Sequence, residues 1–159
     1  MIILQPDTKK CMSSLLLHTS FDLFSFIEGE ITTYARFTMD GYLQKDFFEE
    51  PPKDTYALWK DMRGYCLSII KGTRTPLHFK LILSLSAKDT ASFLAEHGLD
   101  FTSDEIGGLF LNFRFDGTRL SCTTGVSTSR FTLDKSLEQT WDKQVQILFS
   151  SLDIPFEYA

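Results

Sequence analysis

A run of alternating apolar and polar residues in the middle of the chain constrains the fold more than any other feature. After Pro76, apolar side chains occupy every second position, and the positions between them are mostly polar: Leu77, Phe79, Leu81, Leu83 and Leu85 alternate with His78, Lys80, Ile82 and Ser84. Because successive side chains of a strand point to opposite faces of a sheet, this pattern predicts a strand with one buried face. A sheet built from such strands needs helices on one side only.

Four segments predict the helices that would cover that side. They are 8–17 after Asp7, 55–71 after Asp54, a short helix from Ser86 to before Gly98, and 135–151 after Asp134. Each begins beside a Ser or Asp side chain that can accept a hydrogen bond from the first helical turn. The segment 55–71 has the clearest apolar stripe, and Gly72 is predicted to end it. Gly64 within it predicts a close approach of a neighbouring element.

The other segments carry strand signals. Strands are predicted within 1–5, 21–48 and 109–133, with hairpin turns at Asp40-Gly41 and Asp116-Gly117, a further turn at Gly125-Val126-Ser127, and a last strand at 130–133. An Asp-Gly hairpin followed by a helix opened by Asp occurs in each half, which hints at an internal duplication. The order predicts an α+β fold: a largely antiparallel sheet of hairpins with amphipathic helices packed on one side, in a single domain of residues 1–159.

Composition bounds the class of protein. The chain has 159 residues, of which 43% are hydrophobic, so it can bury a core of its own. A net charge of −5 disfavours general attraction to nucleic acids or anionic membranes. No apolar stretch approaches the roughly 20 residues of a membrane span, and the short apolar start at Met1 lacks the basic region of a signal peptide. Cys11, Cys66 and Cys122 are odd in number and lie in apolar segments, so we interpret them as buried thiols of a cytoplasmic protein.

The sequence contains no recognisable catalytic, cofactor-binding or metal-binding motif. His18, His78 and His97 are far from one another and from the cysteines, so no metal site is predicted. The nucleophile elbow, the phosphate-binding P-loop and the dinucleotide fingerprint are all missing, and no cofactor is expected. Glu28 and Glu30 share one face of a predicted strand, where a pair of carboxylates can do acid–base chemistry, but a solvated sheet face is the favoured interpretation.

One polar segment predicts an anion-binding site. Lys71, Arg74 and Thr75 follow the end of a predicted helix, and Lys80 comes shortly after them. Cationic and hydroxyl side chains gathered in this way can bind a phosphate through charge-assisted hydrogen bonds. The alternative is that cations at the C-terminus of a helix offset the helix dipole, which itself disfavours an anion there.

A second group of cations predicts a nucleic-acid-binding patch. Lys9 and Lys10 lie on the first predicted helix, and Lys60 and Arg63 lie on the second, mostly away from the apolar stripes. If the two helices lie side by side, these residues form one basic surface in an otherwise acidic protein. The alternative is an ordinary solvated helix surface.

Several segments resemble an uncharacterised family of short clostridial proteins. They are Ile27–Tyr34, Phe37–Gly41, Ile70–Pro76, Phe79-Lys80, Phe131–Lys135, Trp141-Asp142 and Ile154–Glu157, so the resemblance spans nearly the whole chain. The family carries a domain of unknown function. The resemblance therefore implies a bacterial cytosolic protein, and it assigns no catalytic residue.

A second resemblance is architectural. Residues 109–133 are similar to the last strands of one sliding-clamp domain, and the opening order of strand, basic helix, strands and second helix follows a clamp-like βαβββ arrangement. Clamp domains turn their helices toward DNA and are acidic elsewhere. The segment 86–107 departs from this pattern, and a ring needs several such domains where this chain has at most one.

The leading interpretation is a non-enzymatic binding or interaction module of the bacterial cytosol, since no catalytic constellation stands out. Its partner would be another protein or a second copy of the chain, and no membrane partner is expected. Two alternatives remain open. One is a small phosphate- or nucleotide-handling enzyme that uses Lys71–Lys80, and the other is a clamp-like DNA-associated protein that uses the basic helices.

Overall fold

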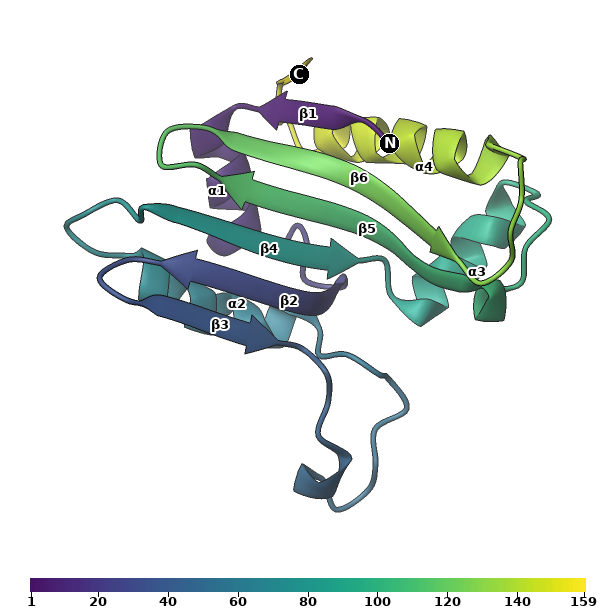
Figure 1. Ribbon diagram of the computed structural model, residues 1–159, viewed down its shortest axis with the longest axis horizontal. Coiled ribbons are helices and arrows are strands. Elements are labelled where there is room, and N and C mark those ends of the chain that lie inside the picture. Colours follow the sequence, from purple (N-terminus) through teal and green to yellow (C-terminus); the bar gives the residue numbers. More distant parts are fainter.

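A computed structural model describes all residues from 1 to 159. It contains one open sheet of seven strands in the order β3-β2-β4-β5-β6-β1-β7, and every neighbouring pair runs antiparallel. The strands are β1 (Ile3–Pro6), β2 (Ser25–Thr32), β3 (Arg36–Asp40), β4 (His78–Ser84), β5 (Ile106–Phe115), β6 (Leu120–Thr128) and β7 (Phe156–Tyr158). Figure 1 shows β3 at one edge of this sheet.

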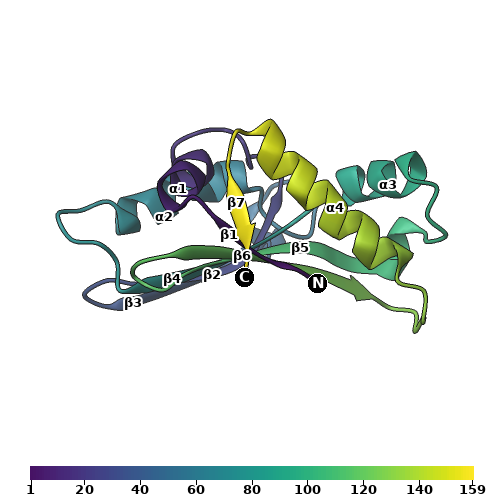
Figure 2. The same ribbon diagram turned by 90° about the horizontal axis from the view of Figure 1, so that it is seen from above.

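Four helices cover one face of the sheet, as Figure 2 shows in the view from above. They are α1 (Thr8–Leu16), α2 (Trp59–Ile70), α3 (Ala87–Glu96) and α4 (Ser136–Ser151), and two short 3-10 helices occur at Lys45–Phe47 and Ser103–Glu105. This arrangement confirms the predicted α+β fold with helices on one side of a largely antiparallel sheet. The element order β-α-β-β-α occurs twice before β7, with two strands where the sequence predicted three.

The core lies between the sheet and the helices, in one cluster of 27 buried residues. The alternation in β4 behaves as predicted, because Phe79, Leu81 and Leu83 are all buried. Two buried tryptophans hold the helices in place, one by bonding to a second helix and one by bonding to the sheet. The indole nitrogen of Trp59 donates to the backbone oxygen of Leu15 at 2.8 Å, and the indole nitrogen of Trp141 donates to a backbone oxygen of β5 at 3.1 Å.

The opposite face of the sheet carries no helix and is mostly polar. Lys80 of β4 lies between Glu30 of β2 and Arg114 of β5 in the register of the sheet. Phe110 is the main aromatic side chain there, and its ring lies over Gly108, where an added Cβ would come within 2.2 Å of the ring. An aromatic ring that covers a neighbouring glycine in this way fills a gap in the sheet surface.

The hairpin predicted at Asp40-Gly41 is wrong. The turn between β2 and β3 lies instead at Thr33–Ala35, and β3 ends at Asp40. Gly41 is required for a different reason: an added Cβ would lie 1.8 Å from the backbone oxygen of Phe26. Beyond this point Ala57 and Leu58 take the place beside β2, and the chain after Gly41 leaves the sheet.

The segment that leaves the sheet, residues 41–58, is called the arm below. Its two sides pair only near its base, where Tyr42 bridges Tyr56 and the backbone nitrogen of Leu43 donates to Thr55. Its far part projects beyond the β3 edge (Figure 1). The sequence had assigned this region to a strand and to the start of a helix, but α2 begins only at Trp59, and Asp54 does not cap it.

Four further predictions, on two turns, a strand and a helix cap, have clear outcomes. The turn at Gly125 and the strand at 130–133 are wrong, because β6 runs without a break to Thr128 and no strand follows it. The Asp116-Gly117 hairpin is confirmed: Gly117 has φ +100°, and Asp116 Oδ1 accepts hydrogen bonds from two backbone nitrogens. Ser86 caps α3 as predicted, by accepting a bond from the backbone nitrogen of Asp89 at 3.1 Å.

Gly64 and Gly41 provide a matched pair of substitutions for testing this fold. No atom lies within 4 Å of a Cβ built at Gly64, so the predicted close approach to it is wrong. We expect Gly64→Ala to raise the free energy of unfolding by about 0.5–1 kcal/mol, because alanine is the better helix former. Gly41→Ala should lower it by about 2 kcal/mol or more, because the added carbon meets a backbone oxygen. Urea denaturation measures the free energy of unfolding of both variants. Equal effects at the two sites would contradict the close backbone contact at Gly41 and the open space at Gly64.

Candidate binding groove

A groove lies between the C-terminal end of α2 and the turn that joins β2 to β3. Its volume is about 730 Å³. It is lined by side chains and backbone from both elements and from the loop before β4: Thr33, Tyr34, Phe37, Ser68, Ile69, Ile70, Lys71, Gly72, Thr73, Arg74, Thr75 and Leu77. The groove forms where the helix layer ends, so the inner face of the sheet is only partly covered there.

The walls of the groove are aromatic and aliphatic. Tyr34 is 93% exposed, and its ring meets that of Phe37 edge to face at 5.9 Å between centroids. Leu77 is 63% exposed on the other side, although the sequence pattern had placed it on the buried face of a strand. β4 begins one residue later, at His78, so Leu77 lies outside the strand and does not follow its alternation. Exposed aromatic and aliphatic side chains that line one hollow are typical of binding sites.

The charge of the groove is purely positive. Lys71 and Arg74 are exposed and form no ion pair in the structure, and no carboxylate lines the groove. Thr75 adds a hydroxyl, and Thr33 has a buried hydroxyl oxygen without a hydrogen-bond partner. An anion bound here would therefore meet cations and hydroxyl groups with no competing negative charge.

Three of the four residues predicted to bind an anion are thus together, and the fourth is elsewhere. Lys80 lies on the uncovered face of the sheet, where it lines a separate hollow of about 270 Å³ together with Glu28 and Glu30. Lys71, Arg74 and Thr75 lie on the helix side. The alternation of side chains along β4 separates Lys80 from the others, because it points opposite to the buried Phe79.

The four cations predicted to form a nucleic-acid patch lie on α1 and α2, which are neighbours in both views (Figures 1 and 2). Lys9, Lys10 and Lys60 are exposed. Arg63 differs, because it forms a bidentate pair with the buried Asp22: its Nε lies 2.9 Å from Oδ1 and its Nη2 lies 3.1 Å from Oδ2. Its charge is thus largely neutralised, and its main contact ties α2 to the loop after α1.

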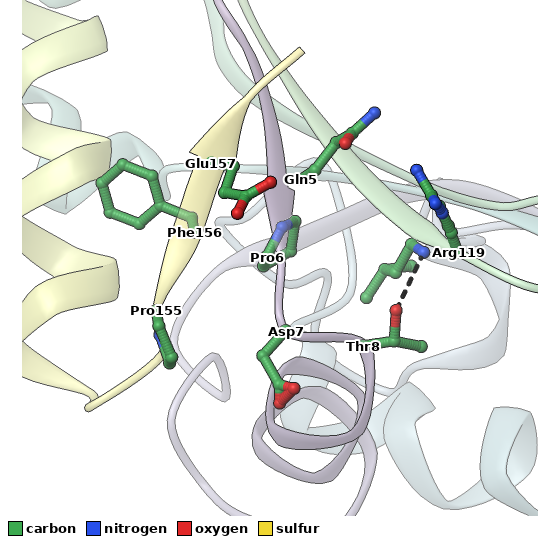
Figure 3. A pocket seen from close by; sticks show the side chains of 9 residues that line it. Gln5, Pro6, Asp7, Thr8, Arg119, Pro155, Phe156 and Glu157 are labelled. Atoms are coloured by element: carbon green, nitrogen blue, oxygen red, sulfur yellow. Dashed lines mark hydrogen bonds between the residues drawn. The ribbon is translucent and has the colours of Figure 1, made fainter.

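A third hollow lies where β1, β7 and the start of α1 meet, and it holds about 470 Å³. Figure 3 shows Asp7 and Glu157 on two sides of Pro6, with Arg119 across from them. The one side-chain hydrogen bond drawn there is structural, from the backbone nitrogen of Leu120 to Thr8 Oγ1 at 3.3 Å. Carboxylates and a guanidinium share this hollow without pairing, so its charge favours no class of ligand.

The cysteines are buried and unpaired, as the sequence predicted. Burial raises the pKa of Cys11 and of Cys66 to about 12, and it raises the pKa of Cys122 well above its ordinary value. Since the thiolate is the reactive form, burial and these raised pKa values disfavour a nucleophilic role for all three. The described residues also contain no group of three or more His, Cys, Asp or Glu side chains that could hold a metal ion. None of the helices has the length and apolar character needed to cross a membrane.

The fold and the groove define an α+β protein with a one-sided antiparallel sheet and a cationic, aromatic-lined groove beside one sheet edge. The chain belongs to a family of unknown function, DUF5721, whose family model matches residues 14–157. This match confirms the resemblance to an uncharacterised family. Neither the curated proteins nor the solved structures gave a match. The resemblance to a sliding-clamp domain stays a prediction.

Thiol reactivity tests the burial of the cysteines. We expect the native protein to react with a chromogenic disulfide reagent at pH 8 far more slowly than free cysteine does, because the raised pKa values keep the thiols protonated and burial blocks access. After addition of guanidinium chloride, all three thiols should react at once. Fast reaction of even one equivalent in the native state would contradict the buried arrangement.

The pair between Arg63 and Asp22 should contribute to stability rather than to binding. We expect Arg63→Ala to lower the free energy of unfolding by about 3 kcal/mol, because it leaves the Asp22 carboxylate buried without a partner. Lys60→Ala, an exposed change on the same helix, should alter it by less than about 0.5 kcal/mol. Thermal and urea denaturation provide the measurement, and similar effects of the two variants would show that Arg63 is not anchored in this way.

Proposed function

We propose that this protein is a non-enzymatic, cytoplasmic interaction module whose groove binds a protein segment that carries an aromatic ring next to negative charge. The observation that carries the proposal is the composition of the groove, in which the aromatic wall of Tyr34 and Phe37 stands beside the unpaired cations Lys71 and Arg74. An aromatic side chain would pack against the wall, and a carboxylate or phosphate beside it would meet the cations.

The alternative of a phosphate- or nucleotide-handling enzyme has less support from the same groove. Lys71, Arg74 and Thr75 can hold a phosphate, but the groove contains no carboxylate, histidine or thiol to act as a base or nucleophile. The clamp-like alternative keeps Lys9, Lys10 and Lys60 as its cations, while Arg63 is engaged with Asp22. A module that recognises charge and an aromatic ring together requires only the side chains that are present.

Binding of phenyl phosphate and of inorganic phosphate distinguishes the interaction module from the phosphate-handling enzyme, because only phenyl phosphate has an aromatic ring. We expect phenyl phosphate to bind more tightly than inorganic phosphate, and to shift the amide resonances of residues 71–75 and of Leu77 in NMR titrations of the labelled protein. Arg74→Ala should weaken both ligands by up to about fivefold, the effect of losing one exposed ion pair. Tyr34→Ala should weaken phenyl phosphate alone by a few fold, through loss of the ring contact.

Lys88→Ala is the matched control, because Lys88 is an exposed cation on α3 that does not line the groove. It should leave both titrations unchanged. Equal binding of the two phosphates, with no effect of Tyr34→Ala, would favour the phosphate-handling alternative. Shifts confined to α1 and the start of α2 would instead move the binding surface to the basic helices and refute the groove.

A further inference from the structure

The outer side of the edge strand β3 is unpaired, and the charges of this strand are self-complementary. Only β2 pairs with β3, so one side of Arg36–Asp40 has free backbone hydrogen-bonding groups. The segment that returns from the arm does not cover this edge. The backbone nitrogen of Ala57 donates to Gly41, and the backbone nitrogen of Phe26 donates to Ala57, so the returning segment lies between Gly41 and β2. An exposed strand edge of this kind is a template for pairing with another strand.

We propose that a second copy of this chain pairs antiparallel with β3, and that the arm of each copy lies in the groove of the other. A two-fold axis through Thr38 places Arg36 of one copy opposite Asp40 of the other, twice in the dimer. Opposite charges in directly opposed positions stabilise antiparallel strand pairs. On the inner face the same register places Phe37 opposite Met39, so apolar side chains also meet.

This register pairs opposite charges and also keeps the apolar side chains of both copies on the same face of the sheet. A slip by one residue would place Arg36 opposite Met39 or, in the other direction, Asp40 opposite Phe37, so a charged side chain would meet an inward position of the second copy. Arg36 already contacts Glu30 at 3.0 Å within its own chain, but this pair is exposed, and it leaves further guanidinium nitrogens for Asp40 of the second copy.

The arm and the groove lie at opposite ends of β3. The groove adjoins the turn before Arg36, and the arm starts after Asp40. Within one chain the two are therefore separated by the length of the strand. In the antiparallel pair, however, the end of β3 in one copy meets the beginning of β3 in the other. The start of each arm then lies beside Tyr34 of the second copy, within reach of its groove.

The tip of the arm has the chemistry that the groove selects. Phe47 is 86% exposed and Phe48 is 39% exposed, and the two rings meet edge to face. Asp46, Glu49 and Glu50 flank the two rings, and none of them forms an ion pair. Phe47 lies four residues beyond Leu43, where the two sides of the arm pair, so its reach from that point is at most roughly 13 Å. This acidic aromatic tip is complementary to Lys71 and Arg74, so the arm contact rests on the function proposed above.

Charge reversal at the edge tests the pairing in solution by sedimentation velocity. We expect the wild type to be a concentration-dependent dimer, and Arg36→Asp or Asp40→Arg to raise the dimer dissociation constant at least about tenfold, because each change creates two like-charge contacts across the axis. The double variant R36D/D40R restores opposite charges and should dimerise again. An equimolar mixture of the two single variants should also form dimers, because their charges are complementary to each other.

A second set of variants tests the arm. Phe47→Ala with Phe48→Ala, and separately Arg74→Glu, should each weaken the dimer several-fold, while Phe131→Ala, an exposed phenylalanine elsewhere, should not. If these changes have no effect while the charge pattern above holds, the arm does not occupy the groove. The phenyl phosphate titration, repeated on the monomeric Asp40→Arg variant, then shows independently whether the groove binds.

Two results would overturn the dimer itself. One is a wild-type protein that stays monomeric up to the highest soluble concentration. The other is a dimer that neither single reversal weakens, since such a dimer would use another surface. In either case, binding of phenyl phosphate to the groove would leave the proposed function intact.

Discussion

The one-sided burial of the sheet is the constraint on which the other features depend. Every long strand buries one row of side chains against the helices, as Phe79 and Leu81 of β4 show, and presents the other row to solvent. Coverage of the inner face is therefore decided by where the helices end. α2 ends at Ile70, before it reaches the turn between β2 and β3. The inner side chains near that turn stay partly exposed, and the groove is the result.

A close backbone contact marks the start of the second unusual feature, the arm. Gly41 approaches the backbone oxygen of Phe26 so closely that no side chain fits between them. Beyond Gly41, Ala57 and Leu58 pair with the start of β2 in place of β3, and the residues between them form the arm. As a result, Phe47 and Phe48 are exposed rather than buried in the core of the same chain. Adjacent exposed aromatic rings on a projecting segment add little to the stability of the monomer, and they are typical of a surface that binds a partner.

The sequence predicted those parts of the fold that depend on short-range pattern. The period of two in β4, the Ser86 cap and the Asp116-Gly117 hairpin all rest on contacts within a few residues, and all are present. Asp40-Gly41 has the same dipeptide but a different outcome, because its conformation is set by Phe26, which lies far away in the sequence. Local pattern contains no information on such a contact.

The candidate site shows the same division. The run from Lys71 to Thr75 was recognised from its cations and hydroxyl groups, and it does line the groove. Tyr34 and Phe37 were missed, because they come from a turn and strand that only the tertiary fold brings next to α2. The separation of Lys80 was within reach of the sequence, since the alternation that predicted β4 already placed Lys80 opposite to Phe79. The pairing of Arg63 with Asp22 was not, because it joins residues 41 positions apart.

The proposed dimer would make the groove a site of competition. If the arm of a second copy occupies it, another acidic aromatic segment binds only to the fraction of grooves that are free, and its apparent affinity falls by that fraction. Protein concentration would then regulate access to the groove without any change in its side chains. Because β3 connects the groove to the arm, pairing along the edge and occupancy of the groove would rise together. Such coupling requires no conformational change within either chain, only the two ends of one exposed strand.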